Sequence, residues 1–370
     1  MTAPSAPSPR VTIVVPTYKE VESLPHLIDR IARVRASGLD IDVLIMDDDS
    51  RDGSEELMAA RSEPWVKMIV RKTDRGLSQA VLDGLRRATG DILVCMDADL
   101  SHPPEVLPSM LLKLDQGADF VLGSRYVDGG TTSHDWGFLR WLNSRVATML
   151  ARPLTAARDP MSGFFALRRS MFQAGQEMNP VGYKIGLEVM VKCRCERVVE
   201  IPIHFEDRAF GESKLTLRQQ LLYLKHLRRL YIFKFGLWSQ LAQFLVVGAL
   251  GTLVNLVLVT LFLAAGTSKQ VAVGGGILLS ICSNFALNRR FSFAGAQRVP
   301  WPRQLVRYLA ASSVGAVINY VVATASIARW PQLPAQLAAF IGIVVGTVFN
   351  FIASRYLVFR AAHIRKRDGD

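Results

Sequence analysis

The 370 residues are enough for two domains, and half of them are hydrophobic, but the apolar residues are spread unevenly. Residues 10–210 have the balance of a soluble domain, whereas residues 238–360 hold long runs that are nearly free of charge. The formal net charge of +12 therefore does not indicate binding to nucleic acid, because the basic residues gather beside the apolar runs and no aromatic-and-basic RNA-binding pattern is present.

The four cysteines do not indicate a zinc site. Cys193 and Cys195 are separated by a single residue, and no second pair accompanies them. We expect reduced thiols, which are typical of a cytosolic compartment. Residues 1–9 are rich in Pro, Ser and Ala and lack the apolar stretch of a signal peptide, so they predict a disordered N-terminus.

Strands and helices alternate through the first half of the chain. Short apolar runs predict strands over residues 11–15, 41–46, 66–70 and 92–96, and helical patterns follow the first three. Strands that are joined through helices run parallel, so we expect an α/β domain whose mostly parallel sheet is covered on both faces. Polar, acidic or aromatic residues end three of these strands at one edge of the sheet and predict one pocket there.

Two carboxylates end the fourth strand. Asp97 and Asp99 are separated only by Ala98, so both would face one site only if the backbone bends after the strand. Carboxylate and phosphate oxygens are the ligands that Mg²⁺ and Mn²⁺ prefer, which makes this turn a candidate metal site. A D-x-D pattern alone is also typical of a solvated acidic turn, and the neighbouring segments favour the metal.

The pocket would suit a nucleotide. Asp48 would accept a hydrogen bond from a base N–H, and Tyr18 would lie against a base or a ribose. The alternative for residues 47–49 is capping of the helix that follows them. The chain contains neither G-x-G-x-x-G nor G-x-x-x-x-G-K-[ST], which argues against NAD enzymes and P-loop ATPases.

Five motifs then occur in a characteristic order. They are Pro16-Thr17-Tyr18-Lys19-Glu20, Asp47-Asp48-Asp49-Ser50, Arg75-Gly76-Leu77, Asp97-Ala98-Asp99 with Ser101-His102-Pro103-Pro104-Glu105, and Gly123-Ser124-Arg125-Tyr126. Through them, residues 10–235 resemble the polyprenyl-phosphate sugar synthases of glycosyltransferase family 2, most closely the dolichyl-phosphate mannose synthases. Lys19 stands where this family usually has Asn, and Ser101 stands where its branch often has Gln as a metal neighbour.

The resemblance implies a GT-A catalytic domain over residues 10–214 and a role for each matching residue. It assigns metal binding to Asp97, Asp99 and Ser101, and catalysis to Asp99, Arg125, Arg140 and Arg208. It assigns nucleotide binding to Pro16, Tyr18, Glu20, Asp48, Asp97, Ala98, Asp99, Arg208 and Lys214. It assigns the acceptor phosphate to Arg125, Arg140, Ser144 and Ser162. Taken alone, the basic loop with Arg208 and Lys214 is equally typical of solvated surface.

The implied reaction is a metal-dependent, inverting transfer of a sugar, most directly mannose from GDP-mannose, to a polyprenyl (dolichyl or undecaprenyl) phosphate. A hydroxyl acceptor would need a carboxylate base, but no Glu-Asp pair follows Phe165. Glu188 is the nearest candidate base, and a helix surface charge is the alternative interpretation. A lipid phosphate is already anionic and needs no base, so catalysis would depend on alignment and electrostatics.

The second half of the chain predicts a membrane domain. Residues 215–237 are basic and amphipathic and predict interfacial helices. Residues 238–360 contain four apolar segments, about 241–263, 271–287, 305–328 and 335–352, each near the length that crosses ~30 Å of hydrocarbon. Gln240 recurs as Gln304 and Asn284 as Asn350, which indicates a parallel duplication of two helices.

These spans resemble the GtrA-like membrane domain, with the match carried by residues 284–293. Basic residues gather at one end of the spans, so the positive-inside rule predicts an integral protein of the plasma (inner) membrane. The catalytic domain, both termini and the basic tail over 361–370 would then be cytoplasmic. Intramembrane asparagines would either pair the helices or face a polar ligand, and small residues would allow close packing and homo-oligomers.

Two other functions fit the sequence. The first is a polyprenyl-phosphate glucosyltransferase that uses UDP-glucose. The second is a flippase or transporter whose soluble half only binds nucleotide-sugar. A processive polysaccharide synthase is disfavoured because the Q-x-x-R-W motif is absent.

Overall fold

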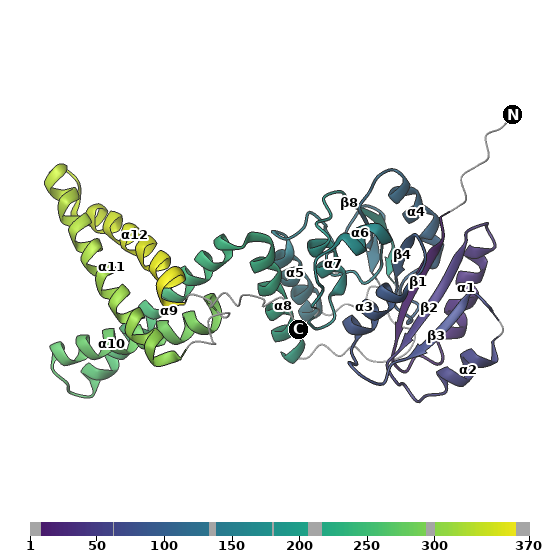
Figure 1. Ribbon diagram of the computed structural model, residues 1–370, viewed down its shortest axis with the longest axis horizontal. Coiled ribbons are helices and arrows are strands. Elements are labelled where there is room, and N and C mark those ends of the chain that lie inside the picture. The colour runs from purple at the N-terminus through teal and green to yellow at the C-terminus, as the bar shows by residue number, and fades with distance from the viewer. Residues whose placement is uncertain are drawn as a thin grey trace, which may run out of the picture. The chain divides into compact units, whose positions relative to one another are not determined.

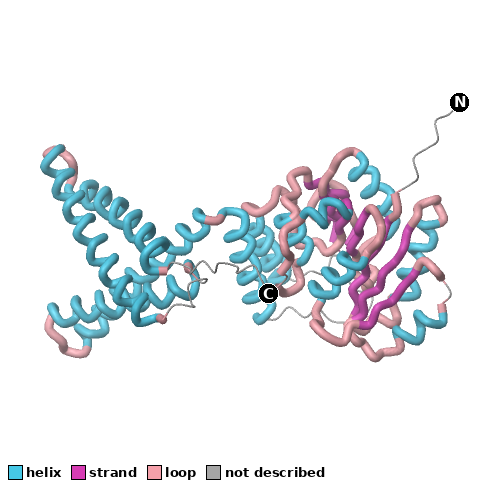
Figure 2. The backbone as a smooth tube through the Cα atoms, viewed as in Figure 1, coloured by secondary structure: helices cyan, strands magenta, loops and turns pink. Residues whose placement is uncertain are grey.

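The computed structural model describes residues 9–61, 63–132, 138–179, 181–205, 217–293 and 300–359 (Figures 1 and 2). The chain divides into two compact units, residues 1–234 and residues 235–370. The first is an α/β unit, and the second is built from long helices.

A seven-stranded sheet forms the centre of the first unit, with the strand order β3-β2-β1-β4-β7-β5-β8. The strands are β1 (Val11–Thr17), β2 (Ile41–Asp47), β3 (Val66–Val70), β4 (Ile92–Cys95), β5 (Phe120–Ser124), β7 (Phe165–Arg168) and β8 (Val198–Pro202). Only β7 runs antiparallel to its neighbours, β4 and β5. The mostly parallel sheet of a GT-A fold is therefore confirmed. β6 (Thr131–Thr132) and β9 (His204–Phe205) form a separate parallel pair.

Helices cover both faces of this sheet (Figure 1). They are α1 (Leu24–Arg35), α2 (Ser54–Ala60), α3 (Leu77–Arg87), α4 (Leu107–Asp115) with the short η1 (Pro104–Val106) before it, α5 (Phe138–Ala151), α6 (Arg169–Ala174) and α7 (Ile185–Lys192). Side chains of α1 and α4 share one apolar core with alternate residues of β1, such as Ile13 and Val15. On the opposite face, a Cβ at Gly84 of α3 would collide with Val14, so this glycine allows close helix–strand packing.

One further helix, α8 (Leu217–Phe235), ends the first unit and packs against its helix α5. The Tyr223 hydroxyl donates to the carbonyl oxygen of Ala147 at 2.7 Å, and the Tyr231 hydroxyl donates to that of Leu150 at 2.8 Å. Both acceptors belong to α5. The segment expected at the membrane interface therefore also forms part of the wall of the α/β unit.

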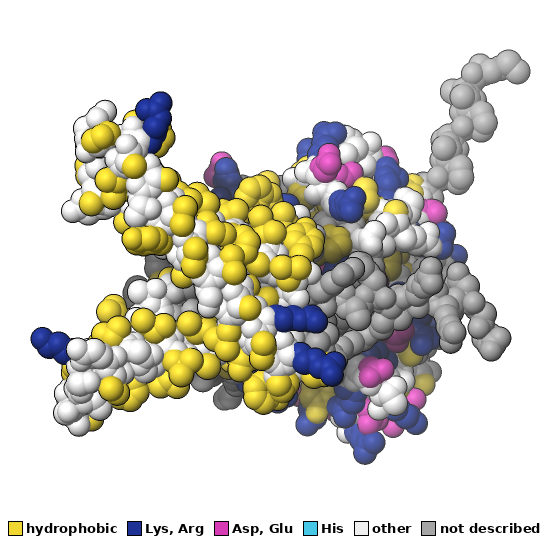
Figure 3. Space-filling view, turned by 60° about the vertical axis from the view of Figure 1, so that its left-hand side comes forward, with side chains coloured by type: hydrophobic (Ala, Val, Ile, Leu, Met, Phe, Trp, Pro, Cys, Tyr) yellow, Lys and Arg dark blue, Asp and Glu magenta, His cyan; other side chains and the backbone are white. Residues whose placement is uncertain are grey.

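The second unit contains four helices that are long and apolar enough to cross a membrane. They are α9 (Leu237–Ala264), α10 (Lys269–Leu287), α11 (Trp301–Arg329) and α12 (Ala335–Ala353), and π-helical turns extend α10 over Asn288–Ser292 and α12 over Ser354–Val358. Hydrophobic side chains cover much of their visible surface (Figure 3), as bilayer-spanning helices require.

The internal repeat is visible as two helix hairpins with matching contacts. In the α9–α10 hairpin, a Cβ on Gly251 would collide with the amide of Asn284; in the α11–α12 hairpin, Gly315 stands in the same relation to Asn350. An aromatic cluster joins the two hairpins, and within it the rings of Phe293 and Phe359 stack at 4.8 Å. The asparagines lie between paired helices, which favours helix packing over a ligand as their role.

Candidate active site

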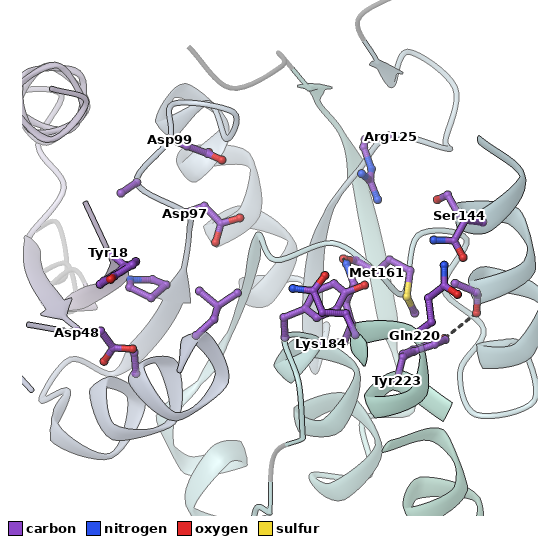
Figure 4. Close-up of a pocket in the computed structure, with 18 of the residues that line it drawn as sticks. Tyr18, Asp48, Asp97, Asp99, Arg125, Ser144, Met161, Lys184, Gln220 and Tyr223 are labelled. Carbon is purple, nitrogen blue, oxygen red and sulfur yellow. Dashed lines mark hydrogen bonds between the residues drawn. The ribbon is translucent and has the colours of Figure 1, made fainter. Parts of the chain in front are cut away.

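A pocket with a volume of about 580 Å³ lies at the carboxyl ends of β1, β2 and β4 and extends to α5, to the residues before α7, and to α8 (Figure 4). It is therefore placed at the sheet edge where the sequence indicates it, in the size range of small-molecule sites. Among the residues named from the sequence, its lining includes Pro16, Tyr18, Glu20, Asp48, Asp97, Ala98, Asp99, Arg125 and Ser144.

The turn after β2 fixes Asp48 at one end of the pocket. The carboxylate of Asp48 pairs with the Arg71 guanidinium and accepts from the backbone N–H of Gly76 at 2.6 Å. Asp47 closes the turn by accepting from the backbone N–H of Ser50 at 2.9 Å. In these contacts neither Asp47 nor Asp48 accepts a hydrogen bond from a backbone N–H of α2. Capping of α2 therefore does not explain Asp48.

Tyr18 lies at the same end of the pocket with its ring open to solvent. The side chain is 46 % exposed, and the Arg75 guanidinium lies 5.3 Å from the ring centroid. Lys19, which precedes Glu20, has its ammonium 5.6 Å from the same ring and a left-handed backbone with φ of 62°. An exposed aromatic face beside two cations is suited to a base or ribose next to a diphosphate.

The bend after β4 orients the D-x-D pair. The backbone N–H of Asp97 donates to His102 Nδ1 at 2.9 Å, and the His102 ring stacks on Phe164 at 5.1 Å. Asp99 is buried, and its Oδ1 accepts from the Ser101 hydroxyl at 2.6 Å. Ser101, which the resemblance implies is a metal neighbour, thus holds Asp99 in place. His102 is a supporting residue of this bend, a role that its place in the motif Ser101-His102-Pro103-Pro104-Glu105 did not predict.

The donor set at this bend fits a Mg²⁺ or Mn²⁺ ion that is shared with a ligand. The described residues contain no cluster of three or more His, Cys, Asp or Glu side chains that would form an all-protein cage. Mg²⁺ commonly binds through one or two carboxylates, with waters and substrate phosphates completing its shell. Asp97, with a third of its side chain exposed, and Asp99 match that arrangement.

Arg125 lies on the opposite wall of the pocket and is already paired. Its Nε and Nη2 atoms each lie 2.8 Å from a carboxylate oxygen of Asp159, in a bidentate pair with the fully buried aspartate. Burial disfavours the guanidinium, but the bond to Asp159 outweighs this and raises the pKa of Arg125. Figure 4 shows the Arg125 side chain pointing towards the interior of the pocket. The role of Asp159 was not predicted, although this residue lies three positions before Ser162.

The remaining residues that the resemblance assigns to the acceptor phosphate or to the basic loop differ in how the structure places them. The Ser144 hydroxyl is hydrogen-bonded to the Tyr126 hydroxyl at 2.8 Å and lines the pocket. Ser162 is buried, and its hydroxyl accepts from the backbone N–H of Phe164, so it shapes the adjacent turn. The Arg140 side chain, and Arg208 and Lys214 entirely, lie outside the described residues.

Lys184 lines the floor of the pocket and was not expected there. Its Nζ donates to the carbonyl oxygen of Met161 at 2.8 Å. Burial lowers the pKa of Lys184 to about 8, and the charge of Arg125 acts in the same direction. From the sequence alone, a lysine just before a helix has no distinguishing signal.

Glu188 is neither a base in the pocket nor a surface charge. It is 1 % exposed, and its carboxylate lies 3.1 Å from His226 Nε2 of α8 and 2.9 Å from Lys192 Nζ. Both interpretations of Glu188 from the sequence are therefore wrong. The residue joins α7 to α8, and α8 in turn supplies Gln219, Gln220, Tyr223 and Leu224 to the pocket.

Comparisons with known proteins agree with this arrangement. Residues 12–175 match the glycosyl transferase family 2 model, and residues 243–359 match the GtrA/DPMS transmembrane domain. The dolichol-phosphate mannosyltransferase of Pyrococcus furiosus is 38% identical over 95% of this chain and 98% of its own. The enzyme of the same name from Mycosarcoma maydis is 43% identical over 62% of this chain and 81% of its own.

Among solved structures, mannosyl-3-phosphoglycerate synthase from Rubrobacter xylanophilus is similar with 19% identity and a TM-score of 0.49, over 60% of this chain and 74% of that chain. The family matches and the apolar helices define a membrane glycosyltransferase. The chain belongs to the dolichol-phosphate mannosyltransferase family within glycosyltransferase family 2.

Proposed function

We propose that the protein transfers mannose from GDP-mannose to a polyprenyl phosphate, with inversion at the anomeric carbon and a requirement for Mg²⁺ or Mn²⁺. The proposal depends on one observation: a single pocket has Asp97 and Asp99 on one wall and Ser144, beside apolar Leu150 and Leu224, on another. Relatives named dolichol-phosphate mannosyltransferase support mannose as the sugar.

The nucleotide would bind where Tyr18 and Asp48 lie. The carboxylate of Asp48 is held by Arg71 and by the Gly76 backbone, which leaves lone pairs free to accept from a base N–H. The exposed ring of Tyr18 offers a flat apolar face for a base or ribose. Pro16 and Glu20 would complete this end of the pocket.

The divalent ion would be held by Asp97 and Asp99, with Ser101 orienting Asp99. When bound, it supplies positive charge that stabilises the leaving nucleoside diphosphate. These carboxylates also limit where the sugar lies, because the anomeric carbon must be next to the β-phosphate.

The acceptor would bind with its phosphate near Arg125 and Ser144. Its prenyl chain would follow the apolar side chains that α5 and α8 contribute, namely Val146, Leu150 and Leu224. We propose that the phosphate binds beside the Arg125 guanidinium, which Asp159 holds on the pocket wall, with Arg140, Arg208 and Lys214 as further phosphate ligands. Ser162 would support this wall through its turn.

No protein base is required for this reaction. A phosphate oxygen of the acceptor forms the new bond to the anomeric carbon, while the bond from that carbon to the diphosphate oxygen breaks and GDP leaves. The protein contributes by aligning two anions that would otherwise repel each other and by compensating their charge. Glu188, the one candidate base from the sequence, is enclosed between α7 and α8 and takes no part.

We also propose that the catalytic unit faces the cytoplasm. Arg289, Arg290 and Arg355 lie at the ends of α10 and α12, and the opposite ends carry only Lys269 and Arg329 among the described residues. By the positive-inside rule, the arginine-rich end is cytoplasmic, and it is the end at which the chain from α8 enters α9.

The proposal is tested with purified protein, radiolabelled GDP-mannose and a polyprenyl phosphate. We expect a labelled lipid that is extracted into butanol and is not formed in the presence of EDTA. UDP-glucose in place of GDP-mannose should give little product. A lipid product formed from UDP-glucose but not from GDP-mannose would refute GDP-mannose as the donor. A product that still forms with EDTA would refute the metal requirement. Lipid movement in liposomes without any product would favour a flippase.

A further inference from the structure

The Lys184 ammonium lies on the pocket floor between the two walls that carry the proposed substrates. Figure 4 shows Lys184 between Asp97 on one side and the Met161–Gln220 side of the pocket on the other. It belongs to the residue pair Tyr183-Lys184 just before α7, and its Nζ also lies 4.7 Å from the Tyr183 ring centroid. One of its three N–H donors is directed to the Met161 carbonyl, so two remain for a ligand.

Lys184 lacks a counter-ion within the part of the chain that the structure describes. No described carboxylate lies within ion-pair distance of Nζ, whereas Lys192, at the other end of α7, pairs with Glu188 at 2.9 Å. Arg125 is paired with Asp159, so among the described residues of the floor it is Lys184 whose positive charge an incoming anion would meet without a carboxylate partner. A half-buried ammonium without a carboxylate partner is unfavourable, and an anion that binds beside it reduces this cost.

We propose that the Lys184 ammonium binds a phosphate group of the reacting substrates, and that this phosphate is the ion-pair partner the residue lacks. This inference rests on the proposed function, since that function brings a nucleoside diphosphate and a lipid phosphate into the same pocket. Either phosphate satisfies the chemistry. A lysine shared by the two would act where negative charge is concentrated during transfer.

Binding of the phosphate would be coupled to proton uptake. Burial, followed by the charge of Arg125, lowers the pKa of Lys184 to about 8, and the charges of Asp159 and Asp97 partly oppose this shift. The other titratable groups beside the ammonium, Tyr183 and Tyr223, have pKa values that burial raises. Near pH 8, a phosphate that pairs with Lys184 should therefore draw a proton onto it, on the order of half a proton per site.

The experiment is calorimetric titration of the full-length protein near pH 8 in two buffers of different ionisation enthalpy, without metal. GDP probes the donor side, and geranyl phosphate probes the acceptor side. We expect proton uptake with at least one of them, and the probe that shows it identifies which phosphate Lys184 contacts. Lys184→Arg should bind that probe without uptake, because arginine stays protonated, and Lys184→Gln should weaken binding on the order of tenfold.

Lys192→Arg is the matched control, since its charge is already paired with Glu188 and it should leave the uptake unchanged. If both probes bind without proton uptake, or if Lys184→Arg retains the uptake, the proposal is overturned. A measurement on the wild-type protein tests the proposal even if a variant does not fold. The affinity for the probe should fall as the pH rises beyond about 8, and an affinity that does not change with pH would overturn the proposal. The calorimetry measures binding and no sugar transfer. Failure of the proposed function would instead appear in the transfer experiment, as the absence of a labelled lipid product.

Discussion

At the bend after β4, two contacts decide where the carboxylates of the proposed metal site point. His102 Nδ1 accepts from the backbone N–H of Asp97, and the Ser101 hydroxyl donates to Asp99. The sequence pointed to both carboxylates because the D-x-D pair follows a buried strand and the neighbouring motifs favour a metal site over a solvated turn. It did not reveal these supporting bonds, because they depend on a turn geometry, with φ of 67° at Leu100, that residue types alone do not specify.

Asp99→Asn should lower the metal-dependent transfer rate by on the order of 100-fold or more, because the amide removes a negative charge from the proposed metal site. The rate is measured with GDP-mannose and polyprenyl phosphate at saturating Mn²⁺. Asp115→Asn is the control, since the side chain of this aspartate is 70% exposed and pairs with Arg168 at 3.3 Å, away from the pocket lining. Equal rates for the two variants would remove Asp99 from the proposed site.

The contacts of Arg125 and Lys184 could likewise not be predicted from residue types alone. The resemblance drew attention to Arg125, and the structure places it on the pocket wall, but its pairing with Asp159 joins residues 34 positions apart and could not be predicted from spacing. Lys184 was missed because a single lysine before a helix is usually a surface residue. Its importance emerges only from burial and from the absence of a described counter-ion.

At the scale of elements, the contact of α7 with α8 determines the shape of the pocket end where we propose that the acceptor binds. Glu188 accepts from His226 of α8 and from the backbone N–H of Asn179, the latter at 2.6 Å. Helix α8 was expected from its composition as an interfacial helix, but its composition does not indicate that buried polar groups hold it against α7. A glutamate among apolar residues of a short helix does not identify its partner 38 positions away.

Glu188→Gln should destabilise the first unit at neutral pH and lose this effect in acid. Burial raises the pKa of Glu188, but bonds from His226, Lys192 and the Asn179 backbone outweigh it and lower the pKa to about 2 from an ordinary 4.5. The ionised side chain therefore stabilises the fold above about pH 4.5, by roughly 3 kcal/mol, and this contribution disappears as pH falls towards 2.

Thermal unfolding of the detergent-solubilised protein, followed from neutral pH down to about pH 3, checks this pH dependence. The melting temperatures of the wild type and Glu188→Gln should converge as the pH falls. Glu55→Gln, which changes an exposed glutamate of α2, should track the wild type throughout. A constant difference between Glu188→Gln and the wild type would mean that the charge of Glu188 does not stabilise the contact between the helices.

At the scale of the whole molecule, sequence patterns predicted the two kinds of unit and the duplicated hairpins well. The length of the apolar segments and the repeated positions of Asn and Gln can be recognised in the sequence without knowledge of the structure. What they did not predict is that each asparagine fits against a glycine of the neighbouring helix, as Asn284 does against Gly251. The pairing depends on helix rotation, which periodicity constrains only loosely.

Gly251→Leu should separate α9 from α10, because any side chain at this position meets the Asn284 amide. Overpacking of this kind costs about 1–3 kcal/mol. The melting temperature of the solubilised protein should fall accordingly. Gly248→Leu, one turn earlier on the same helix, has no atom within 4 Å of its added Cβ and should change little. Similar behaviour of the two variants would argue against close Asn–Gly packing as the basis of the hairpin.

The most direct test of the central claim is an anomalous difference map from crystals of the full-length protein soaked with Mn²⁺ and GDP. The account predicts one manganese peak beside Asp97 and Asp99, in contact with the diphosphate, and the base at the Tyr18 and Asp48 end of the pocket. A manganese peak away from residues 97 and 99, or GDP bound with no ion beside them, would contradict it.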